Sequence, residues 1–160
     1  MTARIVMVYI EPTPYIISLV EKLRKIWGGA IEAYYITTDL SQPWQLRLQS
    51  EQDRILPTSF FLQMKTLYLA LIRDRTSTIL HLAGWGNPVL LGVMLMAKSL
   101  SIPIAVESDT GEERSDRFWR SVFKKLLYPL MLSLPNRFLP GGTRQARYLT
   151  RFGVKQDRIR

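Results

Sequence analysis

The sequence predicts an α/β domain with a mostly parallel sheet and helices on both faces, and three observations lead to this prediction. Short apolar runs of strand length alternate along the chain with segments of helical periodicity. The segments between successive strands are mostly helical, as parallel pairing requires. The strand runs are apolar almost throughout, which is typical of strands covered on both faces. The 160 residues suit one domain with a sizeable core.

The first part of the chain predicts two strands with a helix between them. Residues 5–9 and 31–37 are the two apolar runs of strand length. Thr13 is placed to cap a helix whose first position is Pro14, where a missing N–H costs nothing. Apolar residues then recur at helical spacing until Gly28, which is typical of a helix end.

The middle of the chain predicts a long loop followed by a helix–strand–helix unit. Residues 38–58 lack clear periodicity and contain two prolines, so we expect a loop there with at most a helical turn. Helical spacing returns over residues 60–75, and residues 78–82 form the next strand. A further helix is expected from Pro88 to about Leu100.

The last third predicts two more strands and two more helices. A strand over residues 102–106 leads into a polar loop at 107–113. A long helix is expected over 115–134, with a kink at Pro129 because proline removes a backbone donor. The closing strand and helix are expected at residues 137–140 and 143–152.

Net charge is the unusual feature of the composition. The chain has 22 lysines and arginines against 13 acidic residues, which gives a net charge of +9. This excess predicts attraction to polyanions such as nucleic acid, anionic lipid or phosphorylated substrates. The chain has no cysteine, which excludes disulfides and thiolate chemistry and is typical of a cytoplasmic protein.

In open α/β sheets, ligands bind outside the carboxyl ends of the strands, so the loops that follow strands are the candidate sites. The first such loop, residues 10–15, enters a helix N-terminus whose free amides can receive an anion. It lacks the glycine pattern of dinucleotide-binding loops, so NAD or FAD is not expected. Pro14 and Tyr15 are its candidate binding residues. The alternative is that Pro14 only starts the helix and Tyr15 packs.

The second loop follows the strand at 78–82 and contains Gly84, Trp85 and Gly86. An indole between two glycines is more easily exposed than packed, and aromatic faces stack on sugar rings. The alternative is that Trp85 caps the core. His81, the only histidine, lies inside the apolar strand, and we predict a buried, hydrogen-bonded structural role rather than a catalytic one.

The third loop follows the strand at 102–106 and concentrates four carboxylates in an otherwise basic chain. Its first residues are Glu107, Ser108, Asp109 and Thr110. A carboxylate at the end of a central strand can orient a substrate or transfer a proton. The alternative is a solvated loop in which Asp109 or Thr110 makes a turn.

The order of these motifs resembles the N-terminal domain of GT-B glycosyltransferases of the glycosyltransferase 4-like family. The matching motifs are Pro12-Thr13-Pro14-Tyr15, Gly84-Trp85-Gly86, Glu107-Ser108-Asp109-Thr110, Gly141-Gly142-Thr143 and the later Tyr148-Leu149 and Gly153-Val154. The resemblance implies a Rossmann-like acceptor-binding domain over residues 1–153. It also implies that residues 154–160 begin a linker to a second, donor-binding domain that this chain lacks.

The resemblance implies the function of a retaining glycosyltransferase. A sugar would move from a nucleotide-sugar to a glycan or lipid-linked acceptor, and this chain would be inactive without the donor domain, supplied in cis or by a separate chain. The nucleotide-sugar is the expected co-substrate, and no other cofactor and no metal is expected. Asp109 would orient and polarise the reacting groups. The acceptor-binding residues would be Pro14, Tyr15, Gly84, Trp85, Gly86, Glu107, Ser108 and Thr110.

The expected helix at 115–134 carries cations beside a broad apolar stripe, the profile of a helix on an anionic membrane surface. The candidate membrane-surface residues are Arg117, Trp119, Arg120, Lys124 and Lys125. The alternative is an ordinary sheet-packing helix with a basic outer face. The resemblance favours the membrane, since many relatives act on lipid-linked acceptors, and places the protein in the cytoplasm at the inner membrane face.

A second function from another class remains open. The basic surface would also suit a non-enzymatic module that binds anionic lipid or nucleic acid. The sequence shows no helix-turn-helix pattern, no aromatic motif of RNA-binding domains and no zinc ligands, so nucleic acid is the less favoured partner.

Overall fold

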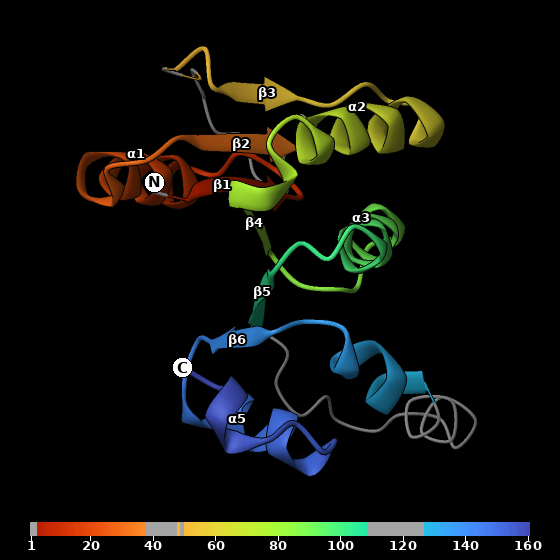
Figure 1. Cartoon of the computed structure of the whole chain (residues 1–160). Coiled ribbons are helices and arrows are strands. Elements are labelled where there is room, and N and C mark those ends of the chain that lie inside the picture. Colours follow the sequence, from red (N-terminus) through yellow and green to blue (C-terminus); the bar gives the residue numbers. More distant parts are fainter. Residues whose placement is uncertain (1–2, 38–47, 49, 109–126) are drawn as a thin grey trace.

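The computed structural model describes residues 3–37, 48, 50–108 and 127–160. Its centre is a parallel sheet with the strand order β3-β2-β1-β4-β5-β6 (Figure 1). The strands are β1 Arg4–Tyr9, β2 Ile31–Tyr35, β3 Asp53–Ile55, β4 Thr78–Leu82, β5 Ile104–Ser108 and β6 Arg137–Pro140. The chain starts in the middle of the sheet, builds one half outward and then returns to build the other. The predicted α/β class with parallel pairing is confirmed.

The described helices follow the predicted positions closely. They are α1 Pro14–Trp27, α2 Phe60–Ile72, α3 Pro88–Ser99 and α5 Thr143–Arg151, with 3-10 turns at Arg75–Ser77 and Gln156–Arg158. Residues 127–133 are also helical. The predicted limits of α1 are confirmed, because the Thr13 hydroxyl accepts a hydrogen bond from the Ile16 amide at 3.3 Å. At the other end Gly28 adopts a left-handed conformation with φ 69°, which glycine reaches at little cost.

Helices cover both faces of the sheet, and β1 shows how the sequence divides its side chains between them. Successive strand residues point to opposite faces. Met7 lies in a small core with Val20 of α1. Val6 lies in the larger core with Leu67 of α2 and Val93 of α3. Figure 1 accordingly shows α1 on the opposite side of the sheet from α2 and α3.

The structure corrects the sequence prediction at two strands. The segment Asp53–Ile55, expected to be loop, pairs with β2 as a short strand, and Arg24 of α1 forms an ion pair with Asp53 at 2.8 Å. This segment is only three residues long and has no alternation of apolar and polar residues, so its sequence does not predict a strand. The strand expected at 102–106 runs instead from Ile104 to Ser108, because pairing with β6 extends it to the end of that strand.

Residues 154–160, expected to begin a linker, pack against β6 in the structure. Ile159 is buried and forms a parallel bridge with Phe138. The Arg158 guanidinium lies 5.4 Å from the centre of the Phe138 ring and donates a hydrogen bond to the Leu132 carbonyl at 2.7 Å. These residues therefore contact the sheet, and the linker and second domain expected from the sequence stay predictions.

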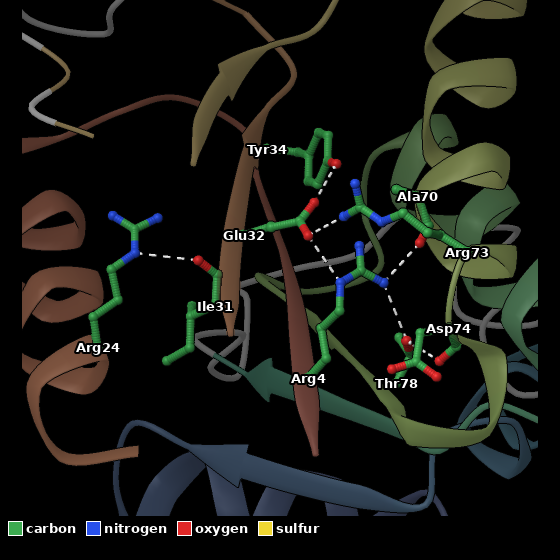
Figure 2. A network of polar contacts seen from close by, with 9 residues as sticks. All are labelled: Arg4, Arg24, Ile31, Glu32, Tyr34, Ala70, Arg73, Asp74 and Thr78. Atoms are coloured by element: carbon green, nitrogen blue, oxygen red, sulfur yellow. Dashed lines mark hydrogen bonds and ion pairs between the residues drawn. The ribbon is translucent and has the colours of Figure 1, made fainter. Parts of the chain in front are cut away.

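A buried polar network joins four elements at the amino-terminal end of the sheet (Figure 2). Arg4, the first residue of β1, donates from Nε to Glu32 Oε1 of β2 at 2.8 Å. Its Nη1 donates to the Ala70 carbonyl of α2 at 2.8 Å and to the Thr78 hydroxyl of β4 at 3.1 Å. One guanidinium thus connects both strands beside β1 to the helix that covers them.

The Glu32 carboxylate is held from several sides. The Tyr34 hydroxyl donates to Oε2 at 2.8 Å, and Arg73, which follows α2, forms an ion pair with Oε1. Burial raises the pKa of Glu32, but hydrogen bonds from Arg4 and Tyr34 and the charges of Arg4 and Arg73 outweigh it and hold this pKa below its ordinary value. Burial and the bond to Glu32 raise the pKa of Tyr34 to about 12.

Candidate functional site

The order of the strands reverses between β1 and β4, and the carboxyl ends of these strands define the expected ligand site of such a sheet. β1 ends at Tyr9 and β4 at Leu82, while the next strand, β5, ends at Ser108. The site is therefore built from the last residues of three neighbouring strands.

Three polar side chains at these strand ends point to the same face of the sheet. Val8, Leu82 and Val106 belong to the core beneath α2 and α3. The residues next to them in each strand point the other way, toward the α1 side. These residues are Tyr9, His81 and Glu107.

The three side chains form one hydrogen-bonded group, which we term the Tyr9–His81–Glu107 cluster. The Tyr9 hydroxyl donates to Glu107 Oε1 at 3.2 Å. His81 Nε2 lies 2.8 Å from the same oxygen and 3.4 Å from the Tyr9 hydroxyl. The Tyr9 and His81 rings are tilted against each other with centroids 5.9 Å apart. His81 and Glu107 follow Tyr9 by 72 and 98 positions in the chain, yet the three side chains meet at one carboxylate oxygen.

Two small residues after β4 shape the space around the cluster. The register pairs Val8 with Leu82, so Ala83 comes level with Tyr9, and Ala83 packs against the small core that contains Tyr9. Gly84 has φ 124°, a conformation that side chains other than glycine rarely adopt, and a Cβ there would lie 4.0 Å from the Glu107 carbonyl oxygen. The turn after β4 can therefore run close beside the end of β5.

The proton positions in the cluster follow from burial and charge. Burial, the nearby Glu107 charge and the hydrogen bond to it raise the pKa of Tyr9 well above its ordinary value of 10. The phenol therefore stays protonated at neutral pH and acts as a donor. Because a carboxylate only accepts, the bond from His81 places a proton on Nε2.

The three side chains of the cluster differ in exposure. Tyr9 is fully buried and the His81 side chain is 11% exposed, whereas the Glu107 side chain is 29% exposed. Both bonds to Glu107 use Oε1, and no bond among the described residues uses Oε2. Glu107 is thus fixed through Oε1 and is the most exposed side chain of the cluster.

Several residues predicted from the sequence lie near this edge of the sheet. Pro14 and Tyr15 are exposed at the start of α1, and the Tyr15 side chain is 75% exposed. Tyr15 is close enough to contribute to the raised pKa of Tyr9. Gly84 and Gly86 lie in the turn after β4. The structure brings these residues to one end of the sheet together with Glu107.

Trp85 and Ser108 are placed differently from the prediction. Trp85 is only 7% exposed and packs edge-on against Phe138, with ring centroids 6.2 Å apart. The expectation of an exposed indole is wrong, and the alternative that Trp85 packs on the core is confirmed. Ser108 is buried on the face opposite Glu107, and its hydroxyl has no hydrogen-bond partner among the described residues. The strand alternation thus separates Ser108 from the cluster.

The other predicted residues lie outside the described residues, and their roles stay predictions. They are Asp109, Thr110, Arg117, Trp119, Arg120, Lys124 and Lys125. Asp109 and Thr110 directly follow the end of β5.

Sequence reasoning did not identify Tyr9 and His81 as site residues. The prediction of a buried, hydrogen-bonded His81 is confirmed, but its partner is the carboxylate of a candidate site residue. A signal was present, since a tyrosine and a histidine occur at or next to the carboxyl ends of two apolar strands. Only the strand order shows that these two strands are neighbours.

Other surfaces of the described part of the chain lack comparable chemistry. No three histidine, aspartate or glutamate side chains there gather into a group that could hold a metal ion. None of the described helices is both long enough and apolar enough to cross a membrane. An open depression of about 590 Å³ lies at α5 and the following 3-10 turn, away from the cluster. It is lined by Thr143, Ala146, Arg147, Thr150, Arg151 and Gln156.

Comparisons with known proteins identify relatives by fold and not by sequence. No protein-family model and no curated protein sequence matches the chain. The chain aligns with the structure of Staphylococcus aureus MnaA with UDP at a TM-score of 0.62 and 14% identity. For the UDP-N-acetylglucosamine 2-epimerase of Rickettsia bellii these values are 0.60 and 12%, and for the putative enzyme of that name from Listeria monocytogenes 0.64 and 10%.

These alignments cover 98–99% of this chain but only 44% of each of the three proteins. The chain thus spans less than half the length of these structures. It has the Rossmann-like α/β fold of one half of a GT-B-like, two-domain protein. At this level of identity the similarity shows the fold alone.

Proposed function

We propose that this chain is the acceptor-side half of a nucleotide-sugar-processing enzyme. The specific reaction we propose is the retaining transfer of a sugar from a nucleotide-sugar to a glycan or lipid-linked acceptor. The observation that carries the proposal is the Tyr9–His81–Glu107 cluster, which presents a partly exposed carboxylate at the point where the strand order reverses.

Glycosyl transfer needs a group that receives or orients the proton of the acceptor hydroxyl. In a retaining transfer the acceptor oxygen bonds to the anomeric carbon on the face from which the nucleotide phosphate leaves, as the bond from that carbon to the phosphate breaks. The hydroxyl proton then requires a base, and Oε2 of Glu107 is available for this role. Tyr9 and His81 hold the carboxylate in one orientation through Oε1. Asp109, two residues later in the sequence, is proposed to orient the acceptor.

The nucleotide is proposed to bind mainly to a second domain, in cis or on a separate chain. One finding supports this: the structural neighbours are more than twice as long as this chain, so more than half of each lies outside the part that this chain matches. This chain also lacks a glycine-rich phosphate loop after β1. The chain alone is therefore expected to bind the sugar side of the reaction without turnover.

Sugar epimerisation is the second candidate function, and the fold comparisons favour it. The neighbouring structures are described as UDP-N-acetylglucosamine 2-epimerases. A fixed carboxylate such as Glu107 also suits the removal of a proton from a sugar carbon. When a donor half is supplied, the products distinguish the candidates: transfer releases the nucleotide and extends an acceptor, whereas epimerisation inverts the sugar at one carbon.

Titration of the chain with small sugars tests the proposed site directly. The probes are UDP-N-acetylglucosamine and the methyl glycosides of glucose, mannose and N-acetylglucosamine, followed by NMR. We expect saturable shifts at the carboxyl ends of β1, β4 and β5 for at least one probe. Glu107→Gln should weaken this binding about tenfold, as loss of a hydrogen bond to a charged group predicts.

Glu51→Gln is the matched control for this titration, because Glu51 is an exposed carboxylate near the start of β3. Its binding should equal that of the unchanged chain. If no probe binds in the millimolar range, or if Glu107→Gln binds as well as Glu51→Gln, the assignment of the site to Glu107 is wrong.

A further inference from the structure

Helix α2 carries apolar side chains on the side that is turned away from the core. Its buried residues are Gln63, Leu67, Ala70 and Leu71. At about 100° per residue, the opposite third of the helix is formed by a different set, which we term the α2 outer face. Its members are Phe61, Leu62, Lys65, Tyr68, Leu69 and Ile72.

The aromatic and aliphatic residues of the α2 outer face are exposed. Phe61 is 74% exposed and Leu69 52%, and Leu62, Tyr68 and Ile72 each expose more than a third of their surface. Exposed apolar residues that stand singly are normal, but these five share one helix face and form a contiguous patch.

Helix α3 extends this patch. It comes close to α2 at Gly92, where an added Cβ would lie 3.0 Å from Met64 Cε and 3.9 Å from Phe60 Cζ. Phe60 is 54% exposed, and Leu95, three positions after Gly92, is 52% exposed. With these two residues the patch presents on the order of 600 Å², since one aromatic side chain carries about 200 Å². This is as large as the largest patches on monomeric proteins, which marks an interaction surface.

The two helices that form the patch carry little charge. Lys65 is the only charged residue of α2, and Lys98 is the only charged residue of α3. The cations of the chain lie mainly elsewhere in the sequence, and residues 137–160 alone contain seven lysines and arginines against one aspartate. A partner that covers the patch must therefore match apolar side chains rather than a strong charge.

The α2 outer face has the residue spacing of a helix–helix contact. Its members at intervals of four, three and four positions are Phe61, Lys65, Tyr68 and Ile72, and this is the spacing of the contact positions in coiled coils. When two such helices pack antiparallel about a two-fold axis between Lys65 and Tyr68, Phe61 of one copy faces Ile72 of the other. Lys65 then faces the Tyr68 ring and not the second Lys65. A cation thus meets an aromatic face twice in the contact.

We propose that the α2 outer face and Leu95 pair with the same surface of a second copy of this chain, with the two α2 helices antiparallel. A standard stable interface buries about 800 Å² on each partner, and the apolar patch with the polar residues at its rim supplies this area. The contact is self-complementary, because the lysine of each copy meets the tyrosine of the other. An acidic partner would find only two lysines on these helices.

Pairing through this surface leaves the candidate site open. Helices α2 and α3 cover the face of the sheet opposite the one to which the Tyr9–His81–Glu107 cluster points. The sheet thus separates the second copy from the cluster. The proposal rests on α2 and α3 alone and holds whether or not the proposed enzymatic function does.

Sedimentation velocity of the purified chain at concentrations of roughly 1–100 μM tests the proposal. We expect a dimer in this range. The double variant Phe61→Ser/Leu69→Ser should raise the Kd of the dimer at least tenfold, because it removes apolar side chains from the contact in both copies. Lys65→Glu should raise it about tenfold, since a carboxylate then faces the Tyr68 ring. Lys65→Glu/Tyr68→Lys places opposite charges across the contact and should restore the dimer.

Ile26→Ser is the matched control, because Ile26 is 78% exposed near the end of α1, on the other side of the sheet. It should dimerise like the unchanged chain, and circular dichroism should show all variants folded. A chain that stays monomeric throughout this range would overturn the proposal, whether or not it binds lipid vesicles through the patch. So would a dimer that Phe61→Ser/Leu69→Ser or Lys65→Glu leaves intact.

Discussion

At the scale of single residues, Tyr9 and Tyr35 form a matched pair. Both are fully buried at the carboxyl ends of neighbouring strands, and their rings stack with centroids 6.3 Å apart. They differ in one respect. The Tyr9 hydroxyl donates to Glu107, whereas the Tyr35 hydroxyl has no hydrogen-bond partner in the part of the chain that the structure describes. Replacing the tyrosine by phenylalanine therefore removes a stabilising hydroxyl at position 9 and a destabilising one at position 35.

Tyr9→Phe should lower the free energy of unfolding by about 1–2 kcal/mol, because Glu107 loses a hydrogen-bond donor. Tyr35→Phe should leave it unchanged or raise it by up to about 1 kcal/mol, because an unsatisfied buried hydroxyl disappears. Urea denaturation of the two variants measures both values. A loss at Tyr35 as large as that at Tyr9 would show that the Tyr35 hydroxyl has a partner in solution.

At the scale of elements, the residues that precede α2 and α3 show that a favourable capping residue does not always cap its helix. Asn87 caps α3, since its side chain accepts a hydrogen bond from the Val89 amide at 2.8 Å. Ser59 occupies the same position before α2, but its side chain makes no such bond. Both are favourable capping residues in the sequence. Only the structure shows that one of them acts as a cap.

Asn87→Ala should cost about 1 kcal/mol of stability, the usual price of a lost cap. Ser59→Ala should change stability by less than about 0.5 kcal/mol, since no hydrogen bond is lost. Thermal unfolding followed by circular dichroism compares them. Equal losses would mean that Ser59 adopts the capping conformation in solution.

At the scale of the whole molecule, the Arg4–Glu32 network links β1, β2, α2 and β4 (Figure 2). The pKa of Glu32 is lowered in the folded protein from the ordinary value of 4.5. The folded state therefore binds this proton less readily than the unfolded state. The resulting stability is present above about pH 4.5 and is lost as the pH falls through the lowered pKa of the folded state.

Glu32→Gln should destabilise the protein by about 3 kcal/mol at neutral pH, because Arg4 is left buried without its carboxylate. It should also flatten the loss of stability that sets in as the pH falls below about 4.5, since the proton uptake linked to unfolding is removed. Urea titrations across this range measure both effects. A variant whose stability falls as steeply in acid as that of the unchanged chain would contradict this role of Glu32.

The candidate site was predictable only in part. Glu107 was identified because it follows an apolar strand, where ligands bind in such sheets. Tyr9 and His81 were not identified, because they reach Glu107 only when β1, β4 and β5 are neighbours in the sheet. Trp85 was expected in the site and lies in the core instead. A sequence pattern does not show whether a ring between two glycines faces the solvent or the core.

The sequence by itself determined the class of the domain and most of its elements. Apolar periodicity and caps such as Thr13 act over a few residues, so they are readable along the chain. Tertiary structure alone decided the strand order, the three-residue strand β3 and the convergence of Tyr9, His81 and Glu107 on one oxygen. These features arise from pairing between distant segments, which leaves no local pattern in the sequence.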